Sequence, residues 1–154
     1  MTDERSPAEH AAQIDAARQR LLTLVRESTN EQWSAAPLDG DPRPVGVVLD
    51  HVAHAYEYLA GWMRDILAGQ QVEVNADVVD VHNAQHAARA GEVSQAQAAD
   101  HLRVSGDVLI ALVEGLDASQ LDAGDGRVRR FAEIAALHAD SHRADIEAAL
   151  AAHG

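Results

Sequence analysis

The residues with the clearest capacity for chemistry in this chain are its nine histidines. His138 and His142 stand four residues apart, which places two imidazoles one turn apart on one face of a helix. Two rings placed in this way can bind one metal ion. His82 and His86 have the same spacing, and nine histidines in 154 residues produce such pairs by chance, so the spacing alone is weak evidence.

The helix face on which the first pair lies is more informative than its spacing. On a helical wheel, His138 and His142 fall among apolar residues of the last predicted helix, namely Phe131, Ile134, Ala135, Ile146 and Ala149. Buried imidazoles need polar partners, and a shared metal ion supplies one partner to both rings. The alternative is a pair of core histidines that hydrogen-bond to separate side chains or to water.

A third metal ligand is expected from a neighbouring helix. His51 lies within the apolar arc of a predicted helix, beside Val48 and Val52. His54 lies about 60° further round the same helix, so we expect it at the rim of this arc or on the surface. Taken alone, His51 would be interpreted as a core histidine. Together with the pair on the last helix, it is predicted to be the third ligand.

Two further residues are candidates for supporting roles. Asp145 lies on the same helix face as His142 and could accept the second ring N–H of that ligand, although a solvent-exposed carboxylate is the alternative. His82 is a candidate for lining a substrate pocket, and the alternative is a core or surface histidine. His86 and Asp50 are both expected on the surface.

The elements that must position these side chains are helices. Alanine, the best helix former, is abundant, and no alternating strand pattern is present. Ser6 and Ser94 are suited to cap two of the helices, and Trp33 is expected to close one end of the fold. We predict an all-α, four-helix bundle with one extra short helix before the third long helix. The expected helices cover about residues 7–27, 45–68, 76–90, 94–114 and 128–152.

Composition excludes several classes of function. The chain has no cysteine, which excludes disulfides, a cysteine nucleophile and a thiolate metal site. A net charge of −13 disfavours nucleic-acid binding, because such a surface repels phosphates. No apolar run approaches the length of a membrane span, and the charged N-terminus does not resemble a signal peptide. We expect one domain over residues 1–154, located in the cytoplasm.

Three segments carry a resemblance to a known family. They are residues 45–55 around His51, residues 80–88 around His82, and residues 134–145 around His138 and His142. In order, spacing and overall length the chain resembles the DinB/YfiT-like superfamily of metal-binding four-helix bundles, whose members include the mycothiol-dependent maleylpyruvate isomerase N-terminal domain and bacillithiol transferase-like proteins. The resemblance implies one divalent metal ion, zinc or nickel, held by His51, His138 and His142. Many relatives carry glutamine where this chain has Asp145.

The resemblance also implies a function. Relatives mostly act on a low-molecular-weight thiol, so the chain is expected to be a metal-dependent thiol S-transferase, with isomerase or hydrolase activity as related options. Because the chain lacks cysteine, a mycothiol-like thiol would arrive as a cosubstrate beside an electrophilic substrate. A homodimer is expected. Two alternatives remain, a non-catalytic bundle stabilised by its metal that acts as a binding or interaction module, and a metal-free bundle that associates through an exposed face.

Overall fold

The structure of the chain, a computed structural model, describes residues 4–34, 43–90 and 93–153. All regular secondary structure in these ranges is helical, which confirms the prediction of an all-α protein. The long helices are α1 (Pro7–Glu27), α3 (Val45–Leu67), α5 (Gln95–Glu114) and α7 (Arg127–His153). The shorter helices are α2 (Asn30–Ser34), α4 (Ala76–Ala90) and α6 (Ala118–Leu121).

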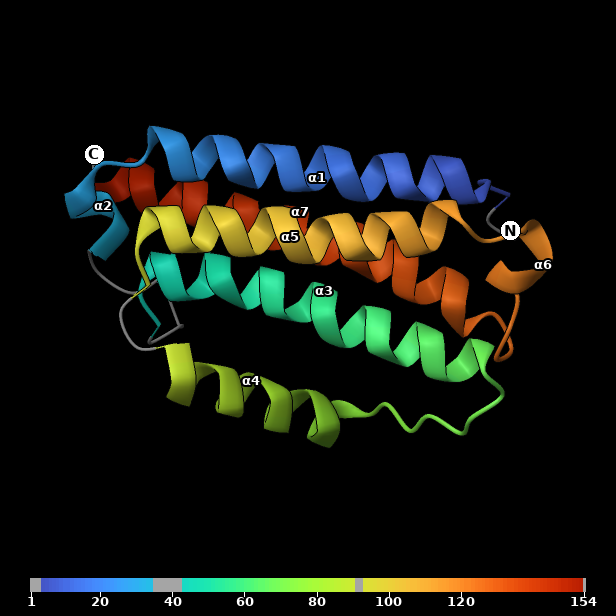
Figure 1. Ribbon diagram of the computed structural model, residues 1–154. Helices are drawn as coiled ribbons and strands as arrows, with labels where there is room; N and C mark the ends of the chain where they lie inside the picture. Colours follow the sequence, from blue (N-terminus) through green and yellow to red (C-terminus); the bar gives the residue numbers. More distant parts are fainter. Residues whose placement is uncertain (1–3, 35–42, 91–92, 154) are drawn as a thin grey trace.

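The four long helices run alongside one another around a shared apolar core (Figure 1). Helices α1 and α3 each pack against both α5 and α7, whereas α4 lies outside this group and packs against α3. The core is built from aliphatic side chains and many alanines, whose small size allows the helices to approach closely. Its fully buried members include Ile14, Leu21, Val48, Leu49, Leu102, Leu109, Val128 and Ile146.

Local sequence explains where the helices begin and end. The hydroxyl of Ser6 accepts a hydrogen bond from the Glu9 backbone N–H at 3.1 Å, at the start of α1. Ser94 and Gln97 form a reciprocal capping box at the start of α5. Gly115 is the C-cap residue at the other end of α5. Because these signals are local, the predicted bounds of α1, α4 and α5 agree with the structure to within a residue.

Two short helices were not predicted from the sequence. Helix α2 lies in the connection after α1. Helix α6 lies between the expected helices 94–114 and 128–152, and Asp117 and Gln120 form a second capping box there. Residues 35–42 of the connection lie outside the described residues. In the described part of the chain, no helix combines the length and the apolar character that crossing a bilayer requires.

Trp33 in α2 closes one end of the core, as predicted. Its side chain is buried, and its indole Nε1 donates a hydrogen bond to the Val93 carbonyl oxygen at 2.6 Å. The indole packs against Gly46 in the first turn of α3, where a Cβ atom would lie only 2.6 Å from the ring. Trp33 therefore ties the connection to the starts of both α3 and α5, close to the part of α3 that carries His51.

Candidate metal centre

Helices α3 and α7 bring three histidines together. His51 lies on the buried face of α3, between Val48 and Val52, because these residues share the apolar arc of that helix. His138 and His142 lie one turn apart on α7. Helices α3 and α7 are neighbours in the core, so the three imidazoles meet between them.

The ring nitrogens of this triad (His51, His138 and His142) converge. His138 Nε2 lies 3.2 Å from His51 Nε2 and 3.1 Å from His142 Nε2. Each of the three side chains offers a ligand atom within 4.8 Å of the other two, and no other group of three potential metal ligands in the described residues meets this condition. The structure therefore brings together the three residues that the sequence predicts as metal ligands.

These nitrogen separations fit a divalent metal ion. Metal–nitrogen distances of about 2.0–2.1 Å in a tetrahedral site place ligand nitrogens about 3.3 Å apart. A neutral imidazole nitrogen carries either one proton or one lone pair, so His138 Nε2 cannot make good hydrogen bonds to both of its neighbours at once. A cation between the rings would accept all three lone pairs, which makes the donor set well suited to such an ion.

The electrostatics of the triad favour the protonation state that metal binding needs. Burial lowers the pKa of His51 to about 2, with further contributions from His138 and Arg43. Burial, followed by the neighbouring His142, lowers the pKa of His138 to about 4. Both imidazoles are therefore neutral at pH 7, and neutral histidine is the form that ligates a metal.

A row of aromatic rings extends from the triad along α3 and α4. Tyr58 and Trp62 follow His54 at four-residue intervals on α3, and the Tyr58 and Trp62 rings lie 4.8 Å apart. His82 of α4 stacks on Tyr58 at 5.0 Å and lies 5.7 Å from Trp62. His82 is half-buried among these rings, so it lies in the aromatic row and not among the ligands of the triad.

Asp145 lies away from the triad. Its side chain is exposed, and in the described part of the chain it makes no hydrogen bond or ion pair. It is one turn beyond His142 on α7, but the structure does not bring its carboxylate to that ring. The solvent-exposed alternative describes its position better than the ligand-supporting one.

The structure corrects two expectations about surface residues. His86 was expected to be exposed but is 4% exposed, and Asp50 lies largely buried at the junction of α3, α4 and α5. His86 Nε2 donates a hydrogen bond to Asp50 Oδ2 at 2.8 Å, and His101 Nδ1 donates to Asp50 Oδ1 at 2.6 Å. Helix α4 has a weak apolar stripe, so its buried face could not be recognised from periodicity. The sequence signal that could have indicated the burial of Asp50 was its position next to His51.

The charge state of this cluster follows from its hydrogen bonds. Burial raises the pKa of the Asp50 carboxyl, but the hydrogen bonds from His101 and His86 outweigh burial and hold it well below its ordinary value. The hydrogen bond to Asp50 raises the pKa of His101 to about 9. Burial opposes this increase, and the hydrogen bond to Glu57 adds to it. An ionised carboxylate thus accepts hydrogen bonds from two histidines on two other helices.

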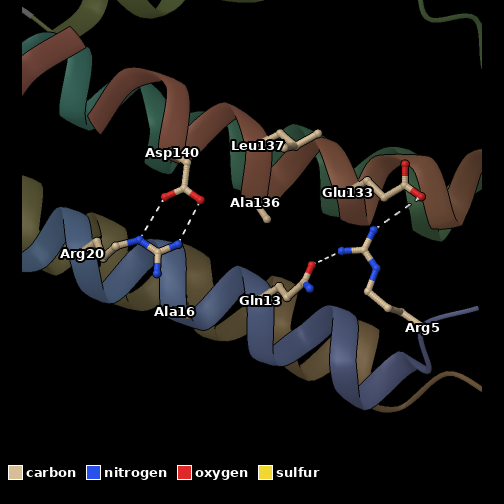
Figure 2. A pocket seen from close by; sticks show the side chains of 8 residues that line it. All are labelled: Arg5, Gln13, Ala16, Arg20, Glu133, Ala136, Leu137 and Asp140. Atoms are coloured by element: carbon tan, nitrogen blue, oxygen red, sulfur yellow. Dashed lines mark hydrogen bonds and ion pairs between the residues drawn. The ribbon is translucent and has the colours of Figure 1, made fainter. Parts of the chain in front are cut away.

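A surface cavity of about 410 Å³ lies on another side of the molecule, between α1 and α7. Figure 2 shows Arg20 with Asp140 at one end of it and Arg5 with Gln13 and Glu133 at the other, with Ala16 and Ala136 between them. Arg20 donates from Nε and Nη2 to the two carboxylate oxygens of Asp140, at 3.0 and 2.9 Å. None of its lining residues is a histidine, so the cavity is separate from the triad.

Comparison with known proteins places the chain in a family. No curated protein and no solved structure gives a significant match to the chain. The family model described as the DinB superfamily matches residues 13–148, a span that includes α3, α4 and α5, most of α1 and α7, and all three histidines of the triad. This match covers most of the sequence. The chain therefore belongs to the DinB superfamily.

Proposed function

We propose that the protein is a divalent-metal-dependent enzyme that transfers a low-molecular-weight thiol to an electrophilic small molecule. In this proposal, residues 1–154 are one domain in which α1, α3, α5 and α7 form a four-helix bundle and α4 is added outside it. The observation that carries the proposal is the convergence of three imidazoles. Three protein ligands leave a tetrahedral ion one position for an external molecule, as in catalytic sites.

The triad supplies a defined set of ligands. His51, His138 and His142 would hold the ion, and nitrogen ligands of this kind suit zinc and nickel. A divalent ion held by these residues would lower the pKa of a thiol that reached it and would favour the nucleophilic thiolate. The chain contains no cysteine, so the thiol is a cosubstrate, and a mycothiol-like molecule is the proposed one.

The aromatic row supplies the surface for the electrophile. Tyr58, Trp62 and His82 present flat, largely apolar faces beside α3, and Trp62 also contacts the Phe131 ring at 5.7 Å. Burial raises the pKa of Tyr58, so its phenol stays protonated and can donate a hydrogen bond. In the proposed reaction these rings exclude water and orient a planar or apolar substrate next to the triad.

The first test is the metal content of the purified chain. Plasma mass spectrometry measures the metal content per chain after reconstitution with zinc or nickel. The proteins compared are tag-free wild type, His138→Ala and the control His101→Ala. We expect about one tightly held ion in wild type and in the control, and none in His138→Ala, because two imidazoles alone bind weakly. A tightly held ion that survives in His138→Ala would reject the triad as the metal site.

The second test addresses the thiol. Cobalt-reconstituted protein is titrated with a small thiol, and sulfur ligation is detected as a new charge-transfer absorption. Turnover is then measured with the same thiol and a chromogenic electrophile, with Tyr58→Phe as a matched variant that keeps the ring but removes the hydroxyl. A site that binds metal but gives neither the new absorption nor turnover would contradict thiol transfer.

One observation favours a second candidate function. His51 is only 2% exposed, and the triad joins α3 to α7 inside the fold. In this second function the ion would stabilise a binding or interaction module and would take no part in catalysis. That function predicts slow metal exchange and no access for thiol, whereas the transferase predicts a thiol-dependent spectrum.

A further inference from the structure

Helix α3 carries histidines toward two different neighbours. His51 meets the histidine pair of α7, as described above. His54, three residues later, contacts the rings of His82 and His86 on α4. The α4 pair has the same four-residue spacing as the α7 pair. The arrangement of one histidine from α3 with two from a neighbouring helix therefore occurs twice. The two groups adjoin, because the His86 ring lies 5.9 Å from the His51 ring.

The second group has ring separations similar to those of the triad. The His54 ring centroid lies 5.1 Å from that of His86 and 6.0 Å from that of His82. In the triad the corresponding separations are 4.5 to 5.3 Å. The difference is orientation, because the His54 and His86 rings are stacked at 20° while the triad rings are nearly perpendicular. The His54 ring must therefore turn against His86 before their nitrogens converge, which weakens binding relative to the triad.

His86 is arranged as metal-ligating histidines usually are. Such histidines donate one ring N–H to a carboxylate, which fixes the tautomer and leaves the other nitrogen as the ligand. His86 Nε2 lies 2.8 Å from Asp50 Oδ2 and donates to this carboxylate, so in the neutral ring Nδ1 is the nitrogen with the lone pair. That Nδ1 is buried and has no hydrogen-bond partner among the described residues. A buried lone pair without a partner is costly, and a cation would satisfy it.

We propose that His54, His82 and His86 form a second divalent-metal site between α3 and α4, with Asp50 as the carboxylate that orients His86. Imidazole ligands select a borderline ion such as nickel, zinc or copper over magnesium or calcium. The site binds more weakly than the triad, because ring rotation accompanies binding. Metal binding at this site does not require thiol transfer, although the site shares His82 with the aromatic row.

Metal titration of the metal-free chain tests this site. Nickel chloride alone is added to wild type, and the bound ion is followed by calorimetry and by equilibrium dialysis. We expect a tight phase and a weaker phase, for a total of two ions per chain. His86→Gln and His82→Ala each lose the weaker phase and keep the tight one, whereas His138→Ala loses the tight phase and keeps the weaker one. Gln85→Ala, an exposed position on α4, serves as the matched control and keeps both phases.

Asp50→Asn gives a graded result. Loss of the orienting carboxylate is expected to lower the nickel affinity of the second, weaker binding phase by about 10–100-fold. Far-ultraviolet circular dichroism checks that every variant keeps its helices. A single phase in wild type at all nickel concentrations would overturn the proposal. So would a weaker phase that persists in the His82→Ala, His86→Gln double variant, because the ion would then be held by surface carboxylates. If the triad does not bind metal, the tight phase is the one that is missing or unaffected by His138→Ala. The two assignments are therefore tested separately.

Discussion

Nε2 of His51 lies 3.2 Å from Nε2 of His138, although 87 residues separate the two histidines along the chain. The contact joins α3 to α7, and His138 Nε2 also lies 3.1 Å from Nε2 of His142 on its own helix. Because both imidazoles are held neutral by burial, they contribute lone pairs and not charge. A cation that binds both nitrogens binds only the folded chain, so metal affinity and fold stability are linked at this contact.

The first prediction concerns this linkage. Removal of metal with a chelator is expected to lower the melting temperature of the reconstituted wild type. An ion present at 100 times its dissociation constant stabilises a fold by about 2.7 kcal/mol. For a chain of this size that corresponds to roughly 5–10 °C. The melting temperature of His138→Ala should respond to the chelator much less than that of wild type, because this variant lacks the tight site, as measured by differential scanning calorimetry. A chelator effect of equal size in both proteins would contradict the prediction.

The second prediction concerns Asp145. Because its carboxylate is exposed and makes no hydrogen bond in the described residues, Asp145→Asn should leave triad metal content unchanged. Stability should also change by no more than about 0.5 kcal/mol, as for most surface substitutions. Metal affinity is measured by competition with a coloured chelator. A tenfold loss of affinity would show that Asp145 supports His142 after all.

The third prediction uses two glycines of the same helix. A Cβ at Gly46 would lie 2.6 Å from the Trp33 indole, whereas a Cβ at Gly61 meets nothing within 4 Å. Gly46→Ala should therefore lower the free energy of unfolding by about 1–3 kcal/mol, through overpacking. Gly61→Ala should raise it by about 0.5–1 kcal/mol, because alanine is the better helix former. Urea denaturation of both variants measures the difference, and equal effects would argue against the close Trp33 packing.

The fourth prediction concerns pH. The pKa of His101 is raised in the fold from 6.5 to about 9, chiefly by its hydrogen bond to Asp50. The folded chain therefore binds this proton more tightly than the unfolded chain does. The resulting stabilisation is complete below pH 6.5 and is lost as the pH rises through 9.

His101→Gln provides the comparison for this window. The free energy of unfolding of metal-free wild type is expected to fall between pH 6.5 and pH 9 relative to that of the variant. Buried His51 and His138 affect stability in a lower pH range. Their pKa values are lowered in the fold, so the free energy of unfolding falls as the pH drops below 6.5. Parallel curves for wild type and His101→Gln above pH 6.5 would show that the Asp50 contact does not stabilise the fold.

Helix positions were largely predictable because their signals are local. Ser6, Ser94 and Gly115 mark helix ends through contacts within a few residues, and the structure has the expected helices at those positions. Helix α6 was missed although Asp117 and Gln120 form the same kind of cap. A four-residue helix has too few residues to show an apolar period, so no helix was expected between residues 114 and 128.

The site was predictable only where the sequence showed which face was buried. His51 and the α7 pair lie on clear apolar stripes, and the sequence singled them out. His86 and Asp50 were placed on the surface because burial of α4 depends on polar contacts to α3 and not on an apolar stripe. Such contacts join residues 36 positions apart, and a helical wheel contains no information about them.

The place of Trp62 in the aromatic row gives the chain an optical reporter of its own. Only two tryptophans are present, and the other, Trp33, is buried at the opposite end of α3. Trp62 lies 5.7 Å from the His82 ring, within the contact range over which a paramagnetic ion such as nickel or copper quenches indole emission. With Trp33 replaced by phenylalanine, the remaining fluorescence would come from a single fluorophore beside α4. Any ligand, ion or helix movement that reaches the aromatic row would then be visible in unlabelled protein.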